Sequence, residues 1–184
     1  FVMDGGTQLT HVEVTWVFDQ FYSLFVISDE GMDADGDLQL TSAEGKRLAT
    51  LYSQWMEGFD GDSYVRLDGE TLWLSGPQDA DMVLDEHGRM VMTFRRALEA
   101  PIEVAGQQIE AQTYDPTFYI QYFVTEPVNV IDGASSCSTE HRPLELNGGL
   151  VELQQNLLDF DIYSTPAIPD VGRQFADTLV LTCG

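Results

Sequence analysis

The alternation of apolar and polar residues predicts a strand at residues 11–18, close to the start of the chain. Apolar side chains occupy its even positions, and polar side chains occupy most of its odd positions. This period of two is typical of a strand with one buried face. From Asp19 the alternation stops, and closely spaced apolar residues predict a short, largely buried helix that ends near residues 29–31.

Two later stretches have apolar residues at helical spacing. The first set consists of Leu48, Leu51, Tyr52, Trp55, Met56 and Phe59. It predicts an amphipathic helix over residues 48–59, because this spacing places the side chains on one face of a helix. The second set, within residues 150–158, predicts one further helix near the C-terminus.

Short apolar runs separated by turn residues predict strands in the rest of the chain. Turn sequences at residues 68–69, 85–88 and 105–108 each lie between two such runs and predict three hairpins. A final strand is predicted at residues 178–182. Short strands with turn signals at regular spacing are typical of a sandwich or barrel.

An aromatic-rich stretch at residues 118–124 places large side chains on both faces of an alternating pattern. We interpret it as a central strand buried on both sides, followed by a further strand at residues 128–131. The alternative interpretation is that the aromatic side chains line a groove.

An acidic stretch at residues 33–44 matches the twelve-residue calcium loop of an EF-hand. In that loop, oxygen ligands come from positions 1, 3, 5, 7, 9 and 12. The ligands predicted here are Asp33, Asp35, Asp37, the main-chain carbonyl of Gln39, Thr41 and Glu44. A helix is predicted on each side of the loop, as the motif requires. Because three neighbouring aspartates repel one another, the pattern favours Ca²⁺ as the cofactor.

The loop departs from the usual motif in two respects: it has no glycine at position 6, and it occurs alone. Position 6 normally holds glycine, because the backbone turns there with positive φ, and this chain has Leu38. A bulky residue in that conformation costs on the order of 1–2 kcal/mol, so we expect weakened affinity. The alternative is a metal-free acidic turn followed by a capping box, which explains Thr41 and Glu44 but not the three aspartates. Leu40 is expected to pack on the sheet, because the loop occurs alone.

These elements predict an α+β fold with a single domain over residues 1–184. Its core is an antiparallel β-sandwich, with an EF-hand-type helix–loop–helix inserted at about residues 20–57 and one further helix near the C-terminus.

The charge balance excludes several classes of partner. The chain has 31 acidic and 8 basic residues, which gives a formal net charge of −23. Nucleic acid and anionic membrane surfaces would be repelled by this charge. No apolar run is long enough to span a bilayer, so membrane insertion is not expected. The sequence also lacks nucleophile-elbow, zinc-protease and phosphate-binding motifs, and we predict that the protein is not an enzyme.

The two cysteines, Cys137 and Cys183, are far apart and do not form the close pair typical of a metal site. We predict a disulfide between them, which implies an oxidising compartment. The alternative is two free buried thiols. Cys137, Glu140 and His141 could hold a soft metal ion, but a disulfide would remove the sulfur ligand from this group.

Four segments carry a resemblance to a known family. They are Val14-Thr15-Trp16-Val17-Phe18-Asp19-Gln20-Phe21-Tyr22-Ser23, the loop at residues 33–44, Thr113-Tyr114-Asp115-Pro116-Thr117-Phe118-Tyr119, and Gly172-Arg173-Gln174-Phe175-Ala176-Asp177. The chain resembles the bacterial domain-of-unknown-function family labelled in genomes as the periplasmic component of an uncharacterised ABC-type transport system. The resemblance covers nearly the whole chain.

This resemblance implies export to the periplasm of a Gram-negative cell, since members carry a signal peptide. Their genes often lie near nickel- and cobalt-type permeases, which implies a role in metal-ion supply or export with a membrane permease as partner. Members typically begin with a His-Pro-His segment, which would lie upstream of Phe1. We therefore expect a non-catalytic, calcium-binding accessory protein for metal-ion transport or homeostasis. The alternative is a calcium-stabilised secreted module that recognises a protein or a glycan.

Overall fold

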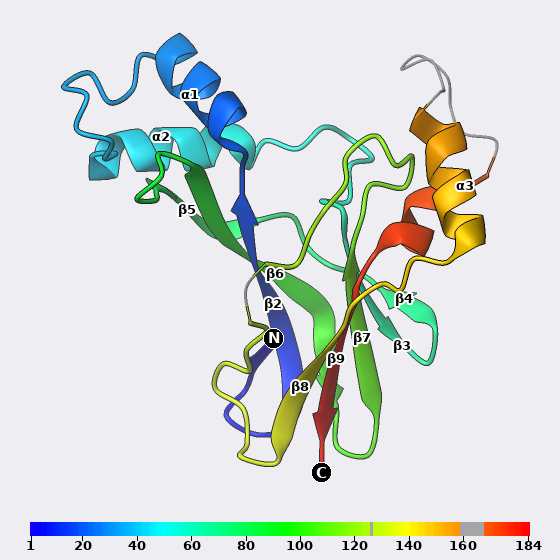
Figure 1. The fold of residues 1–184 in the computed structure, drawn as a ribbon. Coiled ribbons are helices and arrows are strands. Elements are labelled where there is room, and N and C mark those ends of the chain that lie inside the picture. The colour runs from blue at the N-terminus through cyan, green and yellow to red at the C-terminus, as the bar shows by residue number, and fades with distance from the viewer. Residues whose placement is uncertain (126, 159–167) are drawn as a thin grey trace. The chain divides into compact units, whose positions relative to one another are not determined.

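Nine strands form two antiparallel sheets in the computed structural model, which describes residues 1–125, 127–158 and 168–184 (Figure 1). The first sheet has the order β1 (Val2–Met3), β2 (Gln8–Val17), β6 (Met90–Glu103) and β5 (Gln78–Leu84). The second has the order β4 (Glu70–Leu72), β3 (Ser63–Leu67), β7 (Gln108–Thr113), β9 (Thr178–Cys183) and β8 (Cys137–Arg142). The helices of the described ranges are α1 (Gln20–Asp29), α2 (Ser42–Tyr52), α3 (Gly148–Leu158) and a 3-10 helix at Val171–Phe175. The α+β class is therefore confirmed.

The described residues divide into two compact units. The loop unit consists of His11–Phe59 and Ser75–Leu98 and contains α1, α2 and β5. The disulfide unit consists of Phe1–Thr10, Asp60–Leu74 and Glu99–Gly184 and contains the second sheet and α3. Strands β2 and β6 contribute residues to both units. The single domain stays a prediction.

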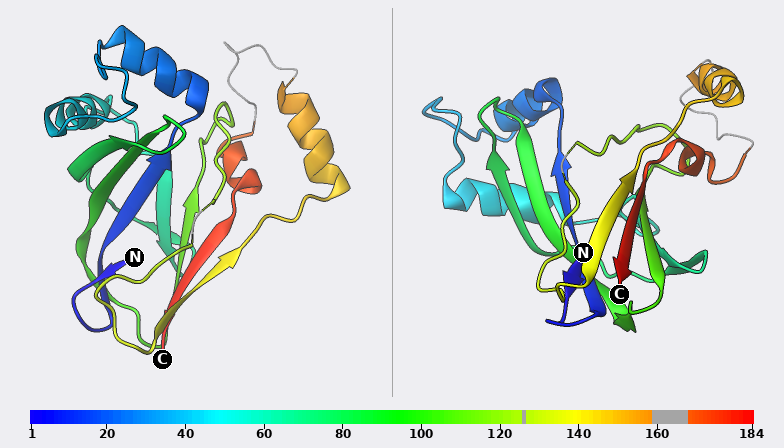
Figure 2. Two further views of the ribbon diagram at one scale, coloured as in Figure 1. Left: turned by 60° about the vertical axis from the view of Figure 1, so that its left-hand side comes forward. Right: turned by 60° about the horizontal axis from the view of Figure 1, so that its bottom comes forward.

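The core of the loop unit joins both helices to β5 and β6. Its most deeply buried side chains are Leu48, Ala49, Met82, Met90, Met92 and Phe94, with Val26, Ile27 and Met32 at its edge. Helix α2 packs on β5 (Figure 2), and the closest approach is at Gly45, where a Cβ atom would clash with the carbonyl oxygen of Met82. Glycine at this position therefore lets the helix lie directly on the strand.

Helix α1 is fixed at its N-terminus by three hydrogen bonds. The Asp19 carboxylate accepts the main-chain N–H of Tyr22 at 2.9 Å, which caps the helix. The buried Ser23 hydroxyl donates to the Asp19 carbonyl oxygen at 2.7 Å and accepts the main-chain N–H of Met90 at 2.9 Å. The bond between Met90 and Ser23 ties the helix to β6.

The prediction that α1 is largely buried is wrong. Only Ser23, Val26 and Ile27 are buried, whereas Phe21 is 88% exposed and Phe25 is 66% exposed. The helix has apolar side chains on every side, so the pattern alone could not indicate which face would be covered.

Helix α2 begins and ends earlier in the chain than predicted, at Ser42–Tyr52 in place of residues 48–59. It ends at Tyr52, where the Ser53 hydroxyl and main-chain N–H both bond to the carbonyl oxygen of Ala49. Trp55 lies beyond this end, and its indole N–H donates to the Tyr52 carbonyl oxygen at 3.1 Å. The hairpin predicted at residues 85–88 is confirmed, with Leu84 opposite Met90.

In the disulfide unit, the hairpin predicted at residues 68–69 is confirmed by the pairing of β3 with β4. The hairpin predicted at residues 105–108 is wrong, because β6 and β7 belong to different sheets. One edge of β7 pairs with β3 and the other with β9, so no edge is left for β6. The turn sequence is real, since the N–H of Gln107 bonds to the carbonyl oxygen of Val104, but the chain changes sheets there.

The strands predicted at residues 118–124 and 128–131 are also wrong. The Asp115 carboxylate accepts the main-chain N–H groups of Thr117, Tyr119 and Ile120 at 2.8–2.9 Å, which folds the first stretch into a turn. At the second stretch, only an isolated bridge between Ile131 and Val2 forms. The helix near the C-terminus and the final strand are confirmed as α3 and β9.

The predicted disulfide between Cys137 and Cys183 is confirmed. These residues lie opposite each other in the pairing of β8 with β9, with Cα atoms 4.0 Å apart. The bond therefore joins neighbouring strands of the second sheet, and the free-thiol alternative is excluded.

Candidate metal centre

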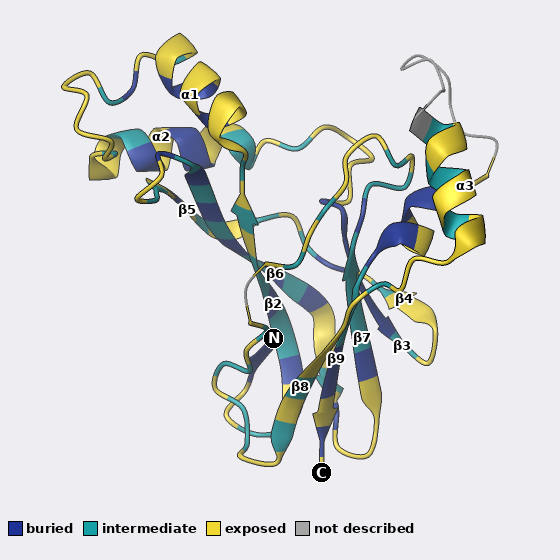
Figure 3. Cartoon of the chain, viewed as in Figure 1, coloured by how far each residue is buried: buried dark blue, intermediate teal, exposed yellow. Residues whose placement is uncertain are grey.

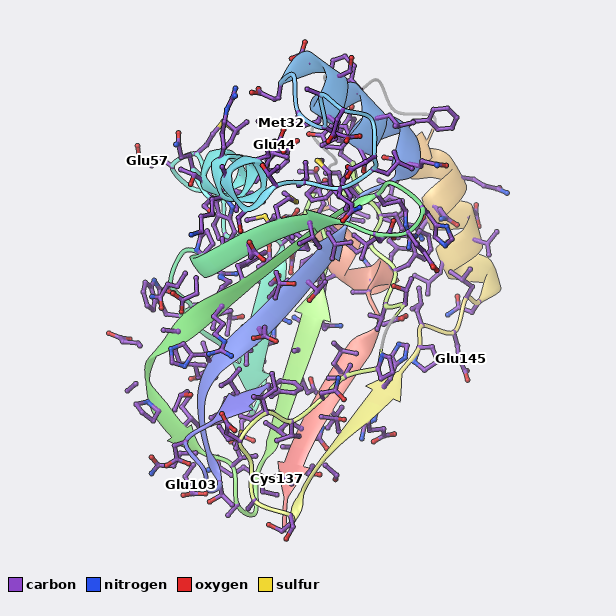
Figure 4. All side chains as sticks on the ribbon, turned by 90° about the vertical axis from the view of Figure 1, so that its left-hand side faces the viewer. Met32, Glu44, Glu57, Glu103, Cys137 and Glu145 are labelled. Atoms are coloured by element: carbon purple, nitrogen blue, oxygen red, sulfur yellow. A yellow bond between two sulfur atoms is a disulfide. The ribbon has the colours of Figure 1, made fainter. Side chains whose placement is uncertain are left out.

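The acidic loop lies between the end of α1 and the start of α2. After α1 the chain turns at Gly31, which has φ of +62°, and the N–H of Met32 bonds to the carbonyl oxygen of Ile27 at 2.9 Å. Met32 is buried in the core cluster of the loop unit, and Figure 4 labels it together with Glu44 in the region of α1 and α2. The loop is thus anchored on one side by an apolar contact.

Three aspartates of the loop come together as predicted from their spacing. One carboxylate oxygen from each of Asp33, Asp35 and Asp37 lies within 4.8 Å of the others. The Asp33 carboxylate also accepts the N–H of Asp37 at 3.0 Å and the N–H of Leu38 at 3.3 Å. These bonds curl the chain around the first aspartate and turn the other two carboxylates toward it.

Glu44 closes the loop from the first turn of α2. One of its carboxylate oxygens accepts the main-chain N–H of Asp33 at 3.1 Å, which joins the two ends of the loop. The other accepts the Thr41 hydroxyl at 2.7 Å and the Thr41 N–H at 2.9 Å. The Thr41 hydroxyl, followed by the Thr41 and Asp33 N–H groups, lowers the pKa of Glu44, while desolvation opposes the shift.

The capping box is therefore present at the start of α2. It gives Thr41 and Glu44 a structural role that does not depend on a metal ion. Within the described residues, the group that could hold a metal ion contains the three aspartates and not Glu44. The predicted ligand at Gln39 is its main-chain carbonyl; the Gln39 side-chain amide, which is not a predicted ligand, donates to the Asp37 carboxylate at 3.4 Å.

The two leucines of the loop lie as their positions suggest. Leu38 has φ of +59°, the left-handed conformation that usually belongs to glycine at this position. Leu40 packs against the core cluster that contains Met82 and Met92 of the sheet, as predicted. The Leu40 side chain thus anchors the loop to the core, while Asp35 and Asp37 are exposed to solvent.

The chemistry of this site follows from its donors, which are all oxygen atoms. Hard cations such as Ca²⁺ prefer carboxylate and carbonyl oxygens, whereas zinc, nickel and copper favour imidazole or thiolate. The loop offers neither of the latter groups. The geometry therefore fits a hard divalent cation.

The structure does not bring the soft-metal group together. Cys137 is in the disulfide and has no thiolate to offer. Glu140 pairs with Arg142 at 2.7 Å, and His141 lies 2.7 Å from the Asp177 carboxylate. Each of these side chains thus has another partner.

A polar and aromatic network in the disulfide unit was missed by the sequence analysis. Its centre is Arg66, which is 3% exposed and donates to the Tyr114 hydroxyl at 2.6 Å and to the Gln112 side chain at 2.9 Å. Nearby, Asp62 is 4% exposed and accepts the Tyr122 hydroxyl at 2.7 Å. Such contacts join residues far apart in the sequence, so no local pattern predicts them.

The structure explains two of the segments that carried the family resemblance. The N–H of Gly172 bonds to the carbonyl oxygen of Pro116, and the rings of Phe118 and Phe175 lie 4.2 Å apart. A Cβ atom at Gly172 would clash with the carbonyl oxygen of Asp115. The two segments therefore pack directly on each other, and glycine is required where they meet.

A family model described as protein of unknown function (DUF1007) matches residues 1–183. The chain belongs to this family. The match spans the acidic loop, the disulfide and the segments that meet at Gly172. No curated protein and no solved structure matches the chain. Within the described parts of this family member, no helix is long and apolar enough to cross a membrane.

Proposed function

We propose that this protein binds Ca²⁺ at the acidic loop and acts as a non-catalytic accessory protein outside the cytoplasm. The observation that carries the proposal is the convergence of three aspartate carboxylates, with oxygen donors alone, between two helices. The ligands we assign are Asp33, Asp35, Asp37, the Gln39 carbonyl, Thr41 and Glu44. Glu44 would exchange its bonds to the Asp33 and Thr41 N–H groups for the ion.

In this proposal, the segment at about residues 20–57 is an EF-hand-type insertion into a sandwich-like core. The lone loop packs Leu40 on the sheet, in place of the second EF-hand that usually covers this residue. Leu38 weakens the site, so we expect a dissociation constant on the order of 10⁻⁴–10⁻³ M, as in extracellular modules.

The wider role we propose is metal-ion transport or homeostasis in the periplasm. The disulfide supports an oxidising compartment. The family resemblance supports a membrane permease of a metal transport system as partner. The transported ion itself would need donors other than this loop if it is a transition metal.

A second candidate function is a calcium-stabilised module that recognises a protein or a glycan. Exposed aromatic side chains favour it, because large exposed apolar groups mark interaction sites. Phe21 and Phe25 are exposed on the loop unit, and Tyr119 and Phe123 are exposed on the disulfide unit.

Thermal unfolding with increasing calcium tests the proposed site. Calcium at a hundredfold excess over its dissociation constant should stabilise the fold by about 2.7 kcal/mol. Asp35→Asn should remove most of this gain. Asp68→Asn is the matched control, because it makes the same change at an exposed aspartate of the β3–β4 turn.

Magnesium at the same concentrations controls for general screening of the negative charge. A melting temperature that does not respond to millimolar calcium would show that the loop is not a calcium site. An equal response to magnesium, or an equal response of Asp35→Asn, would show that the ions act on the overall charge.

A further inference from the structure

The exposed side of α1 is an apolar surface that no element of the described residues covers. It consists of Phe21, Leu24 and Phe25, with Tyr22 at its edge, and we call it the α1 face. Their spacing of three and four residues places Phe21, Leu24 and Phe25 side by side on successive turns. Figure 3 shows that most of this helix is exposed along its length. The helix thus presents its largest side chains to solvent.

The backbone under the α1 face is fixed. Ser23 and Val26 are buried on the opposite side, and the Ser23 hydroxyl accepts the N–H of Met90 of β6. Tyr22 is held as well, because its hydroxyl lies 2.8 Å from that of Tyr52 and its ring stacks on Phe18. The exposed phenyl groups are therefore displayed by an anchored helix, as a preformed binding surface requires.

Ring contacts connect the α1 face to a wider aromatic cluster. From Phe18 the contacts run to Trp16 at 6.4 Å, from Trp16 to Trp55 at 6.0 Å, and from Trp55 to Phe59 at 5.2 Å. All of these residues belong to the loop unit, so the helix is packed against an aromatic cluster of its own unit.

The charges around the α1 face indicate the kind of partner. The helix contains no basic residue, Asp19 caps its start, and Asp29 and Glu30 lie at its end. Glu30 forms an ion pair with Arg47, whose guanidinium lies 2.9 Å from the Glu30 carboxylate. The aspartates of the acidic loop follow directly. An apolar surface bounded by carboxylates complements an apolar segment that carries lysine or arginine.

The same charges argue against other occupants. A second copy would bring two chains of net charge −23 together with acidic rims facing each other. An anionic membrane surface would be repelled for the same reason.

We propose that the α1 face is the docking site for a cationic amphipathic segment of a partner protein. The segment places its apolar side chains on Phe21, Leu24 and Phe25, and its basic side chains beside Asp19, Asp29 and Glu30. This is helix-type recognition, in which an amphipathic segment lays its apolar face on an exposed apolar surface. The inference rests on the second candidate function, whose partner it specifies, and it does not require calcium.

A fluorescent amphipathic peptide built only of leucine and lysine is the probe. Fluorescence anisotropy at physiological salt should show binding to the full chain, both with calcium and with a chelator. Phe21→Ser combined with Phe25→Ser should weaken binding at least about tenfold, because two apolar contacts are lost. Trp73→Ser is the matched control, since it removes an exposed aromatic residue of the disulfide unit and should leave binding unchanged.

Other outcomes would overturn the proposal. Equal binding by the double variant, or by polylysine, would show attraction by charge alone. Equal binding of a leucine–glutamate peptide would refute the charge complementarity. Dimers in sedimentation that dissociate in the double variant would identify a second copy as the occupant.

A measurement without substitution guards against a misfolded variant. On addition of the leucine–lysine peptide, the methyl resonances of Leu24 should shift, while those of Leu146, an exposed leucine of the disulfide unit, should not. Shifts at Leu146 alone would refute the site. Because the peptide is tested with and without calcium, failure of docking and failure of the calcium site are distinguishable.

Discussion

The loop unit and the disulfide unit place their acidic side chains in opposite surroundings. In the loop unit, Asp35 and Asp37 are exposed and lie close to another carboxylate. In the disulfide unit, Asp62 is buried and accepts the Tyr122 hydroxyl, while the buried Arg66 donates to the Tyr114 hydroxyl. The same residue type therefore serves two different purposes.

The two units differ in how the negative charge of these carboxylates is compensated. Buried charges are stable only when nearby groups supply hydrogen bonds, and the tyrosines of the disulfide unit do so. The rings of Tyr64 and Tyr114 stack 4.2 Å apart, and the Arg66 guanidinium lies within 6 Å of both. The converging carboxylates of the loop accept hydrogen bonds from neutral donors, namely main-chain N–H groups and the Gln39 amide, and the cation that would compensate their charge is our proposal. The buried Asp62 is part of a hydrogen-bonded network, whereas the exposed aspartates of the loop form a group that could hold a metal ion.

Among the predicted changes, removal of the disulfide is expected to have the largest effect on the free energy of unfolding. Cys137→Ser combined with Cys183→Ser should lower the free energy of unfolding by about 4 kcal/mol at most, from the closure of a loop with a sequence separation of 46. Urea unfolding measures this loss. The response to calcium should survive, because the loop lies in the other unit. Two thiols that react in the unreduced, denatured wild-type protein would contradict the bridge.

Asp62 should make the disulfide unit sensitive to pH. The pKa of Asp62 is raised to about 6, chiefly by burial and to a smaller extent by the nearby Asp115 and Asp60 carboxylates, while the hydrogen bond from the Tyr122 hydroxyl opposes the shift. The folded protein thus holds this proton more tightly than the unfolded chain. Its contribution to stability is fully present below about pH 4 and is lost as the pH rises through 6.

Asp62→Asn should therefore stabilise the protein at neutral pH by up to about 3 kcal/mol and change little below pH 4. Thermal unfolding as a function of pH measures the difference. Asp68→Asn is the control, because this exposed aspartate has a similar backbone conformation, with φ of +52° against +47°. A constant difference between wild type and Asp62→Asn across the pH range would refute the assignment.

A smaller effect is expected at Leu38. Leu38→Gly should stabilise the calcium-loaded protein by about 1 kcal/mol, because glycine adopts positive φ without the side-chain clash. Unfolding in saturating calcium tests this. Ala34→Gly, at a loop position without positive φ, should give no gain. Equal effects of the two substitutions would show that Leu38 is not strained.

Zinc and nickel should have the smallest effect. The loop offers only oxygen donors, and His141 already lies beside Asp177. With calcium held saturating, calorimetry should show weak binding of either metal to the 184-residue chain. Tight binding of either metal would contradict this prediction and would point to His11 and His141 as ligands.

Features that depend on neighbouring residues along the chain could be predicted without the structure. The turns at residues 68–69 and 85–88, the capping box at Thr41 and Glu44, and the convergence of the loop aspartates all arise from bonds between residues a few positions apart. With two cysteines only one intramolecular disulfide is possible, and the structure decided between this disulfide and two free thiols. Hydrogen bonds between residues a few positions apart, and the spacing of residues in a motif, can be predicted without knowledge of the fold.

Which apolar surfaces are covered, and which strands pair, depends on contacts between distant parts of the folded chain. The pattern of α1 predicted burial, yet its anchoring through Ser23 to β6 leaves Phe21 and Phe25 exposed. The turn at residues 105–108 resembles a hairpin, but β7 pairs with β3 and β9 instead. Likewise, Asp62 finds Tyr122 across sixty positions of sequence. The partner of such a residue depends on which of many possible long-range contacts is the most favourable in the folded chain. A local sequence pattern does not contain this information.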